Sequence, residues 1–405
     1  MGIASMGSGI LAAGGERSAH AASRGTWGAA SPDVYARLGL RPVINAKGTY
    51  TALSGSRMPP EVADAMQEAS RSYVSIPELL EKSGEHLAQL LPCEAALVTS
   101  GAAGALMVGT AACVAGNDEE KARRLPDTLG MKNEVIIQKS HRFSYDHAVR
   151  NVGVRLVEIE SREDLEAAVN PRTALMLFLN KNDPQGKIHH EEWIEAGKKH
   201  HVPTFNDCAA DVPPVENLTR YTRMGYDLVT FSGGKALRGP QCSGLLLGRK
   251  SLVQAARIHN YPASDTICRP CKVGKEEIIG LVTAVERYLK LDHAAEWRGW
   301  ERQIETIDLE IKKVDGVRTE RHVPEIANHV PHLIVRWPEE WNFSREACRD
   351  ALREGEPGIE VGTTDDDDAD GDVILNTFML NPGEERIVAR KLRQALARAN
   401  SNRSA

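Results

Sequence analysis

Short apolar runs alternate with amphipathic segments over much of the chain, and this alternation predicts its fold class. The apolar runs are bounded by turn residues and predict strands, at 95–99, 134–138, 154–159, 173–179, 202–206, 226–231 and 243–247. The segments between them place an apolar residue every three or four positions and predict helices, among them 101–115, 145–151, 162–169 and 190–200. Strands separated by helices are typical of an α/β fold, with a mostly parallel sheet covered on both faces.

The pattern changes after a long helix that we expect at 276–291. Beyond it the sequence predicts helices at 302–313, 345–353 and 384–400 and short strands at 332–335 and 373–376. This mixture of helices and short strands indicates a small α+β domain. A chain of 405 residues is long enough for two domains. We therefore expect an N-terminal arm or signal-peptide remnant at 1–32, a large domain at 33–290 and a small C-terminal domain at 291–405.

Composition narrows the class of protein. Hydrophobic residues make up 41% and charged residues 26%, which is ordinary for a soluble globular protein. A net charge of −6 argues against an extended nucleic-acid surface, and no apolar run approaches the roughly 20 residues of a membrane span. We expect a cytoplasmic chain with a small-molecule partner. Residues 18–22 look like a signal-peptidase site, so export to the periplasm is the alternative if the N-terminus is a truncated twin-arginine signal.

Two features that suggest a metal lack the spacing that a metal site needs. Cys268 and Cys271 form a CxxC, but no second pair of Cys or His accompanies them as in a structural zinc site. The acidic run at 363–372 lacks the spacing of an EF-hand and is typical of a solvated loop. We expect no metal.

The strongest chemical signal is Lys235, which ends the segment Ser232-Gly-Gly-Lys directly after the predicted strand at 226–231. A lysine at the carboxyl edge of a parallel sheet lies where such folds bind ligands, and the two glycines let the backbone turn tightly beside a cofactor. Lys235 is therefore a candidate to hold pyridoxal phosphate (PLP) as a Schiff base. A lone loop lysine is otherwise a solvated surface charge.

Asp207 and His141 follow other predicted strands of the same sheet. A carboxylate at position 207 can pair with the protonated pyridine nitrogen of PLP and so preserve the ring as an electron sink. The alternative is that Asp207 is only a turn or helix-capping residue. The imidazole of His141 can stack over the pyridine ring, and its alternative is a surface loop histidine.

The segment at 99–105 joins a strand to a helix with small residues. Free backbone N–H groups and the helix dipole favour an anion at that helix N-terminus. Ser100 and Ser232 could add hydroxyl donors to a phosphate. The alternative is that small residues only permit close packing of helix on sheet.

These elements, in this order, resemble the fold-type I PLP enzymes, the aspartate-aminotransferase-like group. More narrowly they resemble the bacterial L-seryl-tRNA selenium transferase family, and within it the shorter members typified by D-glucosaminate-6-phosphate ammonia-lyase. The resemblance rests on 43–49, 53–62, 97–103, 232–235 with 239–241, Arg269 with 272–276, and 381–385. The block of the lysine with Gly239-Pro240-Gln241 is its most specific part.

The resemblance implies a role for each candidate residue. Lys235 would bind the cofactor, Asp207 would pair with the pyridinium and His141 would lie over the ring. The phosphate would be held by Ser100, Gly101, Ala102 and Ser232. The site would form at the interface of a homodimer. Arg57 departs from the small or apolar residue usual at that position in the short members, which puts the substrate preference in doubt.

The function that these residues favour is an α,β-eliminating lyase of the ammonia-lyase type, acting on a β-hydroxy or related amino acid. Lys235 would remove the Cα proton as general base. A guanidinium binds a carboxylate bidentately, so Arg269 is the first candidate for the substrate carboxylate and Arg57 the second.

Other functions stay open at this point. A racemase, aldolase or aminotransferase would use the same cofactor and lysine. Transfer of selenium to seryl-tRNA would need a nucleic-acid surface that the acidic charge disfavours. A non-catalytic protein of the same fold would not need Lys235 and Asp207.

Overall fold

The computed structural model describes residues 34–364 and 370–402. The chain divides into two compact units, Met1–Pro42 and Val43–Ala405. In the described part of the first unit, the 3-10 turn η1 (Ala36–Leu38) ends at Gly39, whose φ is 72°. The predicted arm or signal-peptide remnant at 1–32 lies outside the described residues, as does the middle of the acidic run, 365–369.

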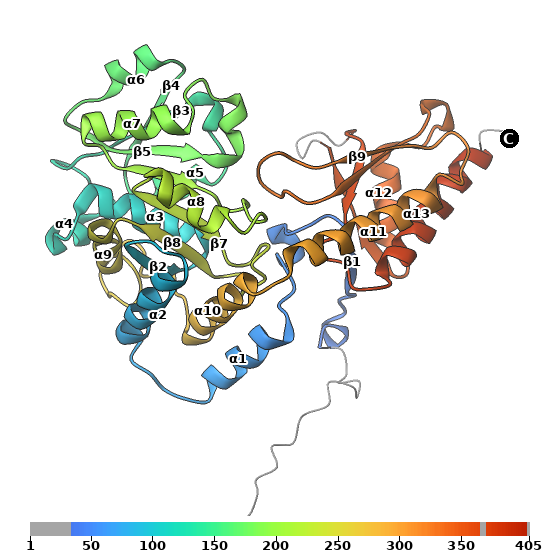
Figure 1. Cartoon of the computed structure of the whole chain (residues 1–405), viewed down its shortest axis with the longest axis horizontal. Helices are drawn as coiled ribbons and strands as arrows, with labels where there is room; N and C mark the ends of the chain where they lie inside the picture. Colours follow the sequence, from blue (N-terminus) through green and yellow to red (C-terminus); the bar gives the residue numbers. More distant parts are fainter. Residues whose placement is uncertain (1–33, 365–369, 403–405) are drawn as a thin grey trace, which may run out of the picture. The chain divides into compact units, whose positions relative to one another are not determined.

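The second unit contains a seven-stranded sheet with the strand order β2-β8-β7-β6-β5-β3-β4 (Figure 1). Its strands are β2 (Ala95–Thr99), β3 (Glu134–Gln138), β4 (Arg155–Ile159), β5 (Thr173–Leu179), β6 (Thr204–Asp207), β7 (Leu228–Ser232) and β8 (Gly244–Gly248). Only β8 runs antiparallel to its neighbours in this sheet. Every residue of β3, β5 and β8 is buried, as in strands whose two faces are both covered. The predicted α/β fold with a mostly parallel sheet is confirmed.

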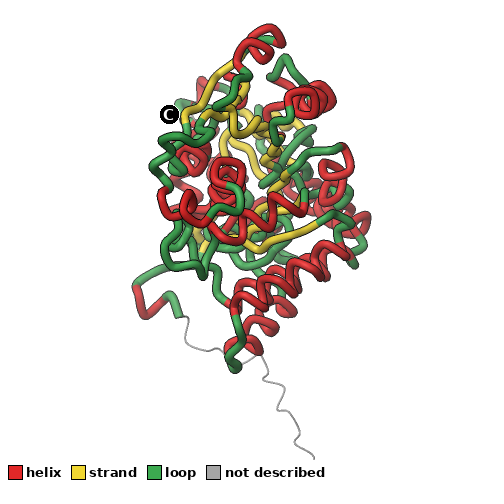
Figure 2. The backbone as a smooth tube through the Cα atoms, turned by 90° about the vertical axis from the view of Figure 1, so that its left-hand side faces the viewer, coloured by secondary structure: helices red, strands yellow, loops and turns green. Residues whose placement is uncertain are grey.

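Helices follow or connect the strands of this sheet (Figure 2). They are α1 (Pro60–Ser70), α2 (Ile76–Leu90), α3 (Gly101–Ala115), α4 (Glu119–Arg124), α5 (Asp146–Arg150), α6 (Arg162–Ala168), α7 (His190–His200), α8 (Asn217–Met224), α9 (Lys250–His259) and α10 (Lys275–Leu289). Helix α3 packs against the central strands, while α7 contacts β6 and α8 contacts β7. Within the described residues, every helix is too short or too polar to cross a membrane.

The C-terminal part of the second unit builds smaller sheets. A four-stranded antiparallel sheet has the order β12-β13-β10-β9, and β1 pairs in parallel with β11. These strands are β1 (Val43–Asn45), β9 (Arg318–His322), β10 (His332–Arg336), β11 (Gly358–Glu360), β12 (Gly362–Thr363) and β13 (Val373–Asn376). The helices here are α11 (His293–Ile311), α12 (Arg345–Glu354) and α13 (Glu384–Asn402).

Two hydrophobic cores correspond to the two groups of sheets. The core of the C-terminal part takes in Ile44 and Ala46, because β1 pairs Ile44 with Ile359. The N-terminal strand of this unit therefore packs with the end of the chain, although the sequence pattern assigned it to the large domain. The division into a large and a small domain near residue 290 stays a proposal.

Helix α3 approaches the sheet closely because its inward residues are small. A Cβ built on Gly109 would lie 2.5 Å from Cε1 of Phe205 and 3.3 Å from Cδ1 of Leu228. Phe205 is fully buried in β6, two residues before Asp207. The glycine therefore sets the spacing between α3 and the strand that carries the predicted pyridinium partner.

We expect Gly109→Ala to destabilise the protein by about 1–3 kcal/mol, because the added methyl overpacks a filled core. Thermal unfolding measures the effect as a lowered melting temperature. The matched control is Gly299→Ala on α11, where the nearest atom to the new Cβ is the end of the flexible Arg302 side chain at 4.0 Å. That change should stabilise the protein by about 0.4–1 kcal/mol. Equal melting temperatures for the two variants would contradict this account of α3 packing.

Candidate active site

The predicted site residues follow strands that end at one edge of the large sheet. Thr99 of β2 and Ser232 of β7 both pair with Gly244, the first residue of β8. Because β2 and β7 both run antiparallel to β8, they end side by side with β8 between them. Ser100 and Ser232 therefore flank the start of β8, and Asp207 ends the next strand. The structure brings these three positions to the same edge, as the sequence predicts.

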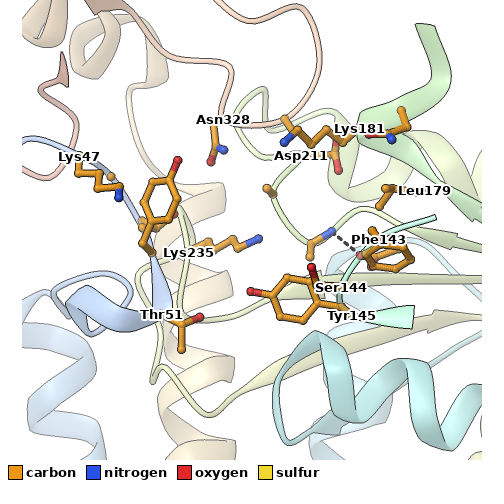
Figure 3. Close-up of a pocket in the computed structure, with 18 of the residues that line it drawn as sticks. Lys47, Thr51, Phe143, Ser144, Tyr145, Leu179, Lys181, Asp211, Lys235 and Asn328 are labelled. Atoms are coloured by element: carbon orange, nitrogen blue, oxygen red, sulfur yellow. Dashed lines mark hydrogen bonds between the residues drawn. The ribbon is translucent and has the colours of Figure 1, made fainter. Parts of the chain in front are cut away.

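A cavity of about 510 Å³ opens at this edge (Figure 3). Its size is typical of small-molecule sites. Segments from both parts of the second unit line it: Lys47–Thr51, Arg142–Tyr145, Leu179, Lys181, Asn182, Asp207, Ala209–Asp211, Lys235, Ala327, Asn328, His332, Asn376 and Phe378. Figure 3 shows the amine of Lys235 directed into this space, with Tyr145 and Asp211 on the other side.

Lys235 is held by a compact turn after β7. The N–H of Gly233 donates to the carbonyl of Ser243 (2.9 Å), and the N–H of Arg238 donates to the carbonyl of Lys235 (2.8 Å). A Cβ on Gly234 would lie 2.5 Å from Cα of Gln241, so this turn needs glycine there. The Gly-Pro-Gln segment thus packs against the two glycines and fixes the direction of the lysine.

Burial lowers the pKa of Lys235, and the nearby carboxylates of Asp207 and Asp211 partly oppose that effect. A lowered pKa increases the fraction of neutral amine, which is the form that attacks a carbonyl and accepts a proton. Asp207 is 4% exposed and accepts a hydrogen bond from the N–H of Ala209 (3.0 Å). Burial raises its pKa, and the charge of Lys235 counteracts the rise.

His141 does not line the cavity, contrary to the prediction that it stacks over the ring. It is fully buried in a 3-10 turn, η3 (Lys139–His141), and packs edge-on against Phe178 at 4.5 Å between ring centroids. The N–H of Leu179 donates to its Nδ1 (3.2 Å). Burial lowers its pKa to about 4. The turn points the imidazole into the core, where it supports the wall formed by Arg142 and Phe143.

Neither predicted arginine lines the cavity. The guanidinium of Arg57 bonds the side chain of Asn381, and its backbone carbonyl accepts from Nε of Arg238 (2.8 Å). Arg269 lies over the ring of Tyr261 with 5.2 Å from Cζ to the centroid. Its Nη1 is buried and has no hydrogen-bond partner among the described residues.

The cavity contains polar groups that sequence reasoning did not single out. Lys47 and Lys181 line it and form no ion pair within residues 34–364 and 370–402, whereas Arg142 pairs with Asp146 and Glu158. Asn376 donates to the carbonyl of Lys47 (3.0 Å) and approaches Nε2 of His332 (3.3 Å). Its Oδ1 is buried without a partner in the same part of the chain. The sequence signal for this group was weak, because its members come from four distant segments.

The L-seryl-tRNA selenium transferase family model matches residues 43–322. That range covers more than half of the chain and includes the whole seven-stranded sheet and its edge. The chain belongs to this family. The prediction of the family from its local motifs is confirmed.

Curated relatives of known activity align over most of the chain. D-glucosaminate-6-phosphate ammonia lyase of Salmonella typhimurium is 30% identical, over 81% of this chain and 89% of its own length. A Streptomyces protein, 5'-C-glycyluridine monooxygenase-decarboxylase, is 29% identical, over 89% of this chain and 92% of its own length. The relatives are enzymes, and one bears the predicted class of activity in its name.

The solved structure of D-glucosaminate-6-phosphate ammonia-lyase superposes with a TM-score of 0.79 at 28% identity. The match covers 92% of this chain and all of the other. The predicted fold-type I PLP transferase-like fold is confirmed. The predicted roles of single residues stay predictions.

We expect Asp207→Asn to lower the pKa of Lys235 further, because it removes a negative charge that favours the ammonium form. The pH dependence of reductive methylation of Lys235, followed by mass spectrometry in cofactor-free protein, measures this. The midpoint should move to lower pH. Asp183→Asn is the control, since Asp183 bonds His189 (3.0 Å) and is outside the charges that act on Lys235. A shift to higher pH would contradict the proposed electrostatics.

Proposed function

We propose that this chain is a PLP-dependent lyase that eliminates a β-substituent, typically a hydroxyl, from an amino acid and releases ammonia. The observation that carries the proposal is that the half-buried Lys235 lines one cavity with the buried carboxyl groups of Asp207 and Asp211 at the carboxyl edge of the sheet. The 30% identity to an ammonia lyase over most of both chains supports the choice of a lyase.

The residues at the sheet edge suit PLP. Lys235 offers an amine for the cofactor aldehyde, and Asp207 is a buried carboxylate that can face a cationic ring nitrogen. Ser100 caps α3 without a side-chain hydrogen bond, and a Cβ on Gly101 would meet no atom within 4 Å. Open space and free N–H groups at this helix N-terminus suit a phosphate. We assign the phosphate to Ser100, Gly101, Ala102 and Ser232, which lie at the same sheet edge although they are not among the residues that line the cavity.

When bound, PLP supplies an electron sink for the bonds at Cα. The chain's own residues would do the rest. Nζ of Lys235 accepts the proton from Cα, as its lowered pKa favours. Asp207 balances the charge of the ring nitrogen. Lys47 and Lys181 are better placed than Arg57 or Arg269 to meet a substrate anion in this subunit, because they line the cavity.

The second candidate is another outcome at the same Cα: racemisation, aldol cleavage, transamination or decarboxylation. The 29% identity to a protein named as a monooxygenase-decarboxylase favours keeping it, because two chemistries occur at nearly equal distance from this chain. The products distinguish these outcomes.

The test is loading with PLP, borohydride reduction and peptide mass spectrometry, followed by assay of ammonia and 2-oxo acid. We expect the cofactor mass on Lys235, and ammonia with 2-oxo acid in equal amounts from D-glucosaminate 6-phosphate or from D- or L-serine. Lys235→Ala should lose both labelling and activity. Lys181→Ala is the matched control, a lysine of the same cavity that should keep the label on Lys235. Labelling elsewhere, or an amino acid racemised without ammonia, would overturn the proposal.

We also propose that the enzyme is a homodimer. Large apolar side chains are exposed between residues 43 and 74, namely Val43, Tyr50, Tyr73 and Val74. Such a set favours burial by a partner. Light scattering during size-exclusion chromatography should give twice the chain mass of 44.3 kDa, and Tyr73→Glu should shift the mass toward the monomer. A native protein that elutes at the monomer mass would contradict the proposal.

A further inference from the structure

Asp211 is a second carboxyl group in the cavity, four positions after Asp207. It lines the same space as Lys235 and Lys181, yet the residue as a whole is only 2% exposed. Figure 3 shows it across the cavity from the lysine amine. The local backbone structure does not depend on an acidic side chain at this position. The N–H of Asp211 donates to the carbonyl of Cys208, and the carbonyl of Asp211 accepts from the side chain of Asn217.

A chain of amide side chains fixes the orientation of this carboxyl group. Nδ2 of Asn180 donates to Oδ1 of Asp211 (2.7 Å) and contacts the hydroxyl of Tyr221 (2.8 Å). Nδ2 of Asn206 donates to Oδ1 of Asn180 (3.0 Å). Asn180 and Asn206 are completely buried. This buried network holds one carboxyl oxygen, so Asp211 is preorganised with respect to the cavity.

Burial favours the protonated form of Asp211, and the hydrogen bond from Asn180 partly opposes it. Asp207 adds a second negative charge, Lys235 opposes it, and Cys208 and Tyr221 are neutral groups packed beside it. Burial and Asp207 together raise the pKa of Asp211 to about 7. Two carboxyl groups near one amine do not both ionise readily in a buried site. A proton can therefore rest on Asp211 at neutral pH.

We propose that Asp211 is the general acid that protonates the leaving oxygen at Cβ. The assignment rests on the proposed lyase function and adds to it the group that makes hydroxide a feasible leaving group. In the step, Nζ of Lys235 takes the Cα proton and the electrons of that C–H bond form the Cα=Cβ bond. The Cβ–O bond breaks, and the proton of Asp211 joins the departing oxygen to give water.

The atoms and protons of this step balance without another reactant. Hydrolysis of the resulting enamine consumes one water and yields the 2-oxo acid and ammonia. The proton that Lys235 gained returns Asp211 to its acid form through solvent in the cavity. A group that leaves as a stable anion, such as chloride, needs no proton. This dependence on the leaving group separates an acid from a residue that only shapes the site.

The test compares two leaving groups in the PLP-loaded enzyme. Asp211→Asn keeps an oxygen that can accept from Asn180 but has no acidic proton. We expect elimination from serine or D-glucosaminate 6-phosphate to fall about 100-fold or more, while elimination from β-chloroalanine changes only a few-fold. Exchange of the Cα proton with deuterium from solvent should persist, since Lys235 performs it. Asp211→Glu should recover part of the lost rate.

A second measurement needs no turnover. At about pH 6, where ordinary carboxyl groups are ionised, the cofactor-free native protein should show an infrared band of a protonated carboxylic acid that Asp211→Asn lacks. Equal losses with hydroxyl and chloride leaving groups, or an unchanged infrared spectrum, would overturn the role of Asp211. A native enzyme that eliminates from no β-substituted amino acid would instead overturn the lyase proposal.

Discussion

The structure around the cavity depends on one constraint: a lysine amine and two carboxyl groups share a buried space. Lys235, Asp207 and Asp211 act on one another electrostatically, and burial disfavours the charged form of each. Isolated charges in such surroundings cost several kcal/mol each. The least costly state places one negative charge against one positive charge and keeps the third group neutral. The site is therefore poised to exchange protons.

The fold maintains this constraint from several directions. The sheet supplies Asp207 from the end of β6, and the turn after β7 supplies Lys235 through glycines that no larger residue could replace. The loop between β9 and β10 closes the space from the C-terminal part: the N–H of Asn328 donates to the carbonyl of Ala210 (2.8 Å), next to Asp211. The asparagine network behind Asp211 fixes its direction. Each contact is individually modest, but together they hold the three ionisable groups around one cavity.

Much of the fold and part of the site could be predicted from the sequence, for a local reason. Asp207 lies at the end of a buried strand and Lys235 in the turn after another. The order of such strands in a parallel sheet places their ends together. The strands β2, β3 and β5 have the predicted bounds. Helices α1 and α9 were not predicted, although α9 buries an apolar face that includes Leu252, Val253 and Ala256.

The remaining site residues could not be predicted, because they lie far apart in the sequence and meet only in the folded chain. Lys47 and Asn376 meet only because β1 joins the C-terminal sheets, where the N–H of Asn376 donates to the carbonyl of Ala46. His141 was misplaced for a different reason. A histidine one turn after a strand can face either the ligand or the core, and the 3-10 turn that decides between them depends on Phe178 and Leu179 of the neighbouring strand. Asp211 looked like part of an ordinary turn, because burial and the neighbouring charge, which make it reactive, are tertiary properties.

The position of the acid Asp211 relative to Lys235 also bears on how members of one family catalyse different reactions. A lysine that removes the Cα proton opens several outcomes, and the group next able to deliver or accept a proton selects among them. An acid that reaches Cβ favours loss of a β-hydroxyl, whereas an acid that reaches Cα from the opposite face favours racemisation.

In this chain the carboxyl groups of Asp207 and Asp211 lie on one strand and the turn that follows it. Asp207 accepts from the backbone N–H of Ala209, and Asp211 accepts from the buried amide of Asn180 and the backbone of Ala327. Both donors favour an ionised carboxylate, and burial opposes them at each position. The charge of Lys235 is the largest effect that opposes burial at Asp207, whereas Asp211 also experiences the like charge of Asp207, which raises its pKa. Two neighbouring carboxyl groups are thereby assigned two roles, and the difference arises from the charges beside them rather than from the identity of the side chains.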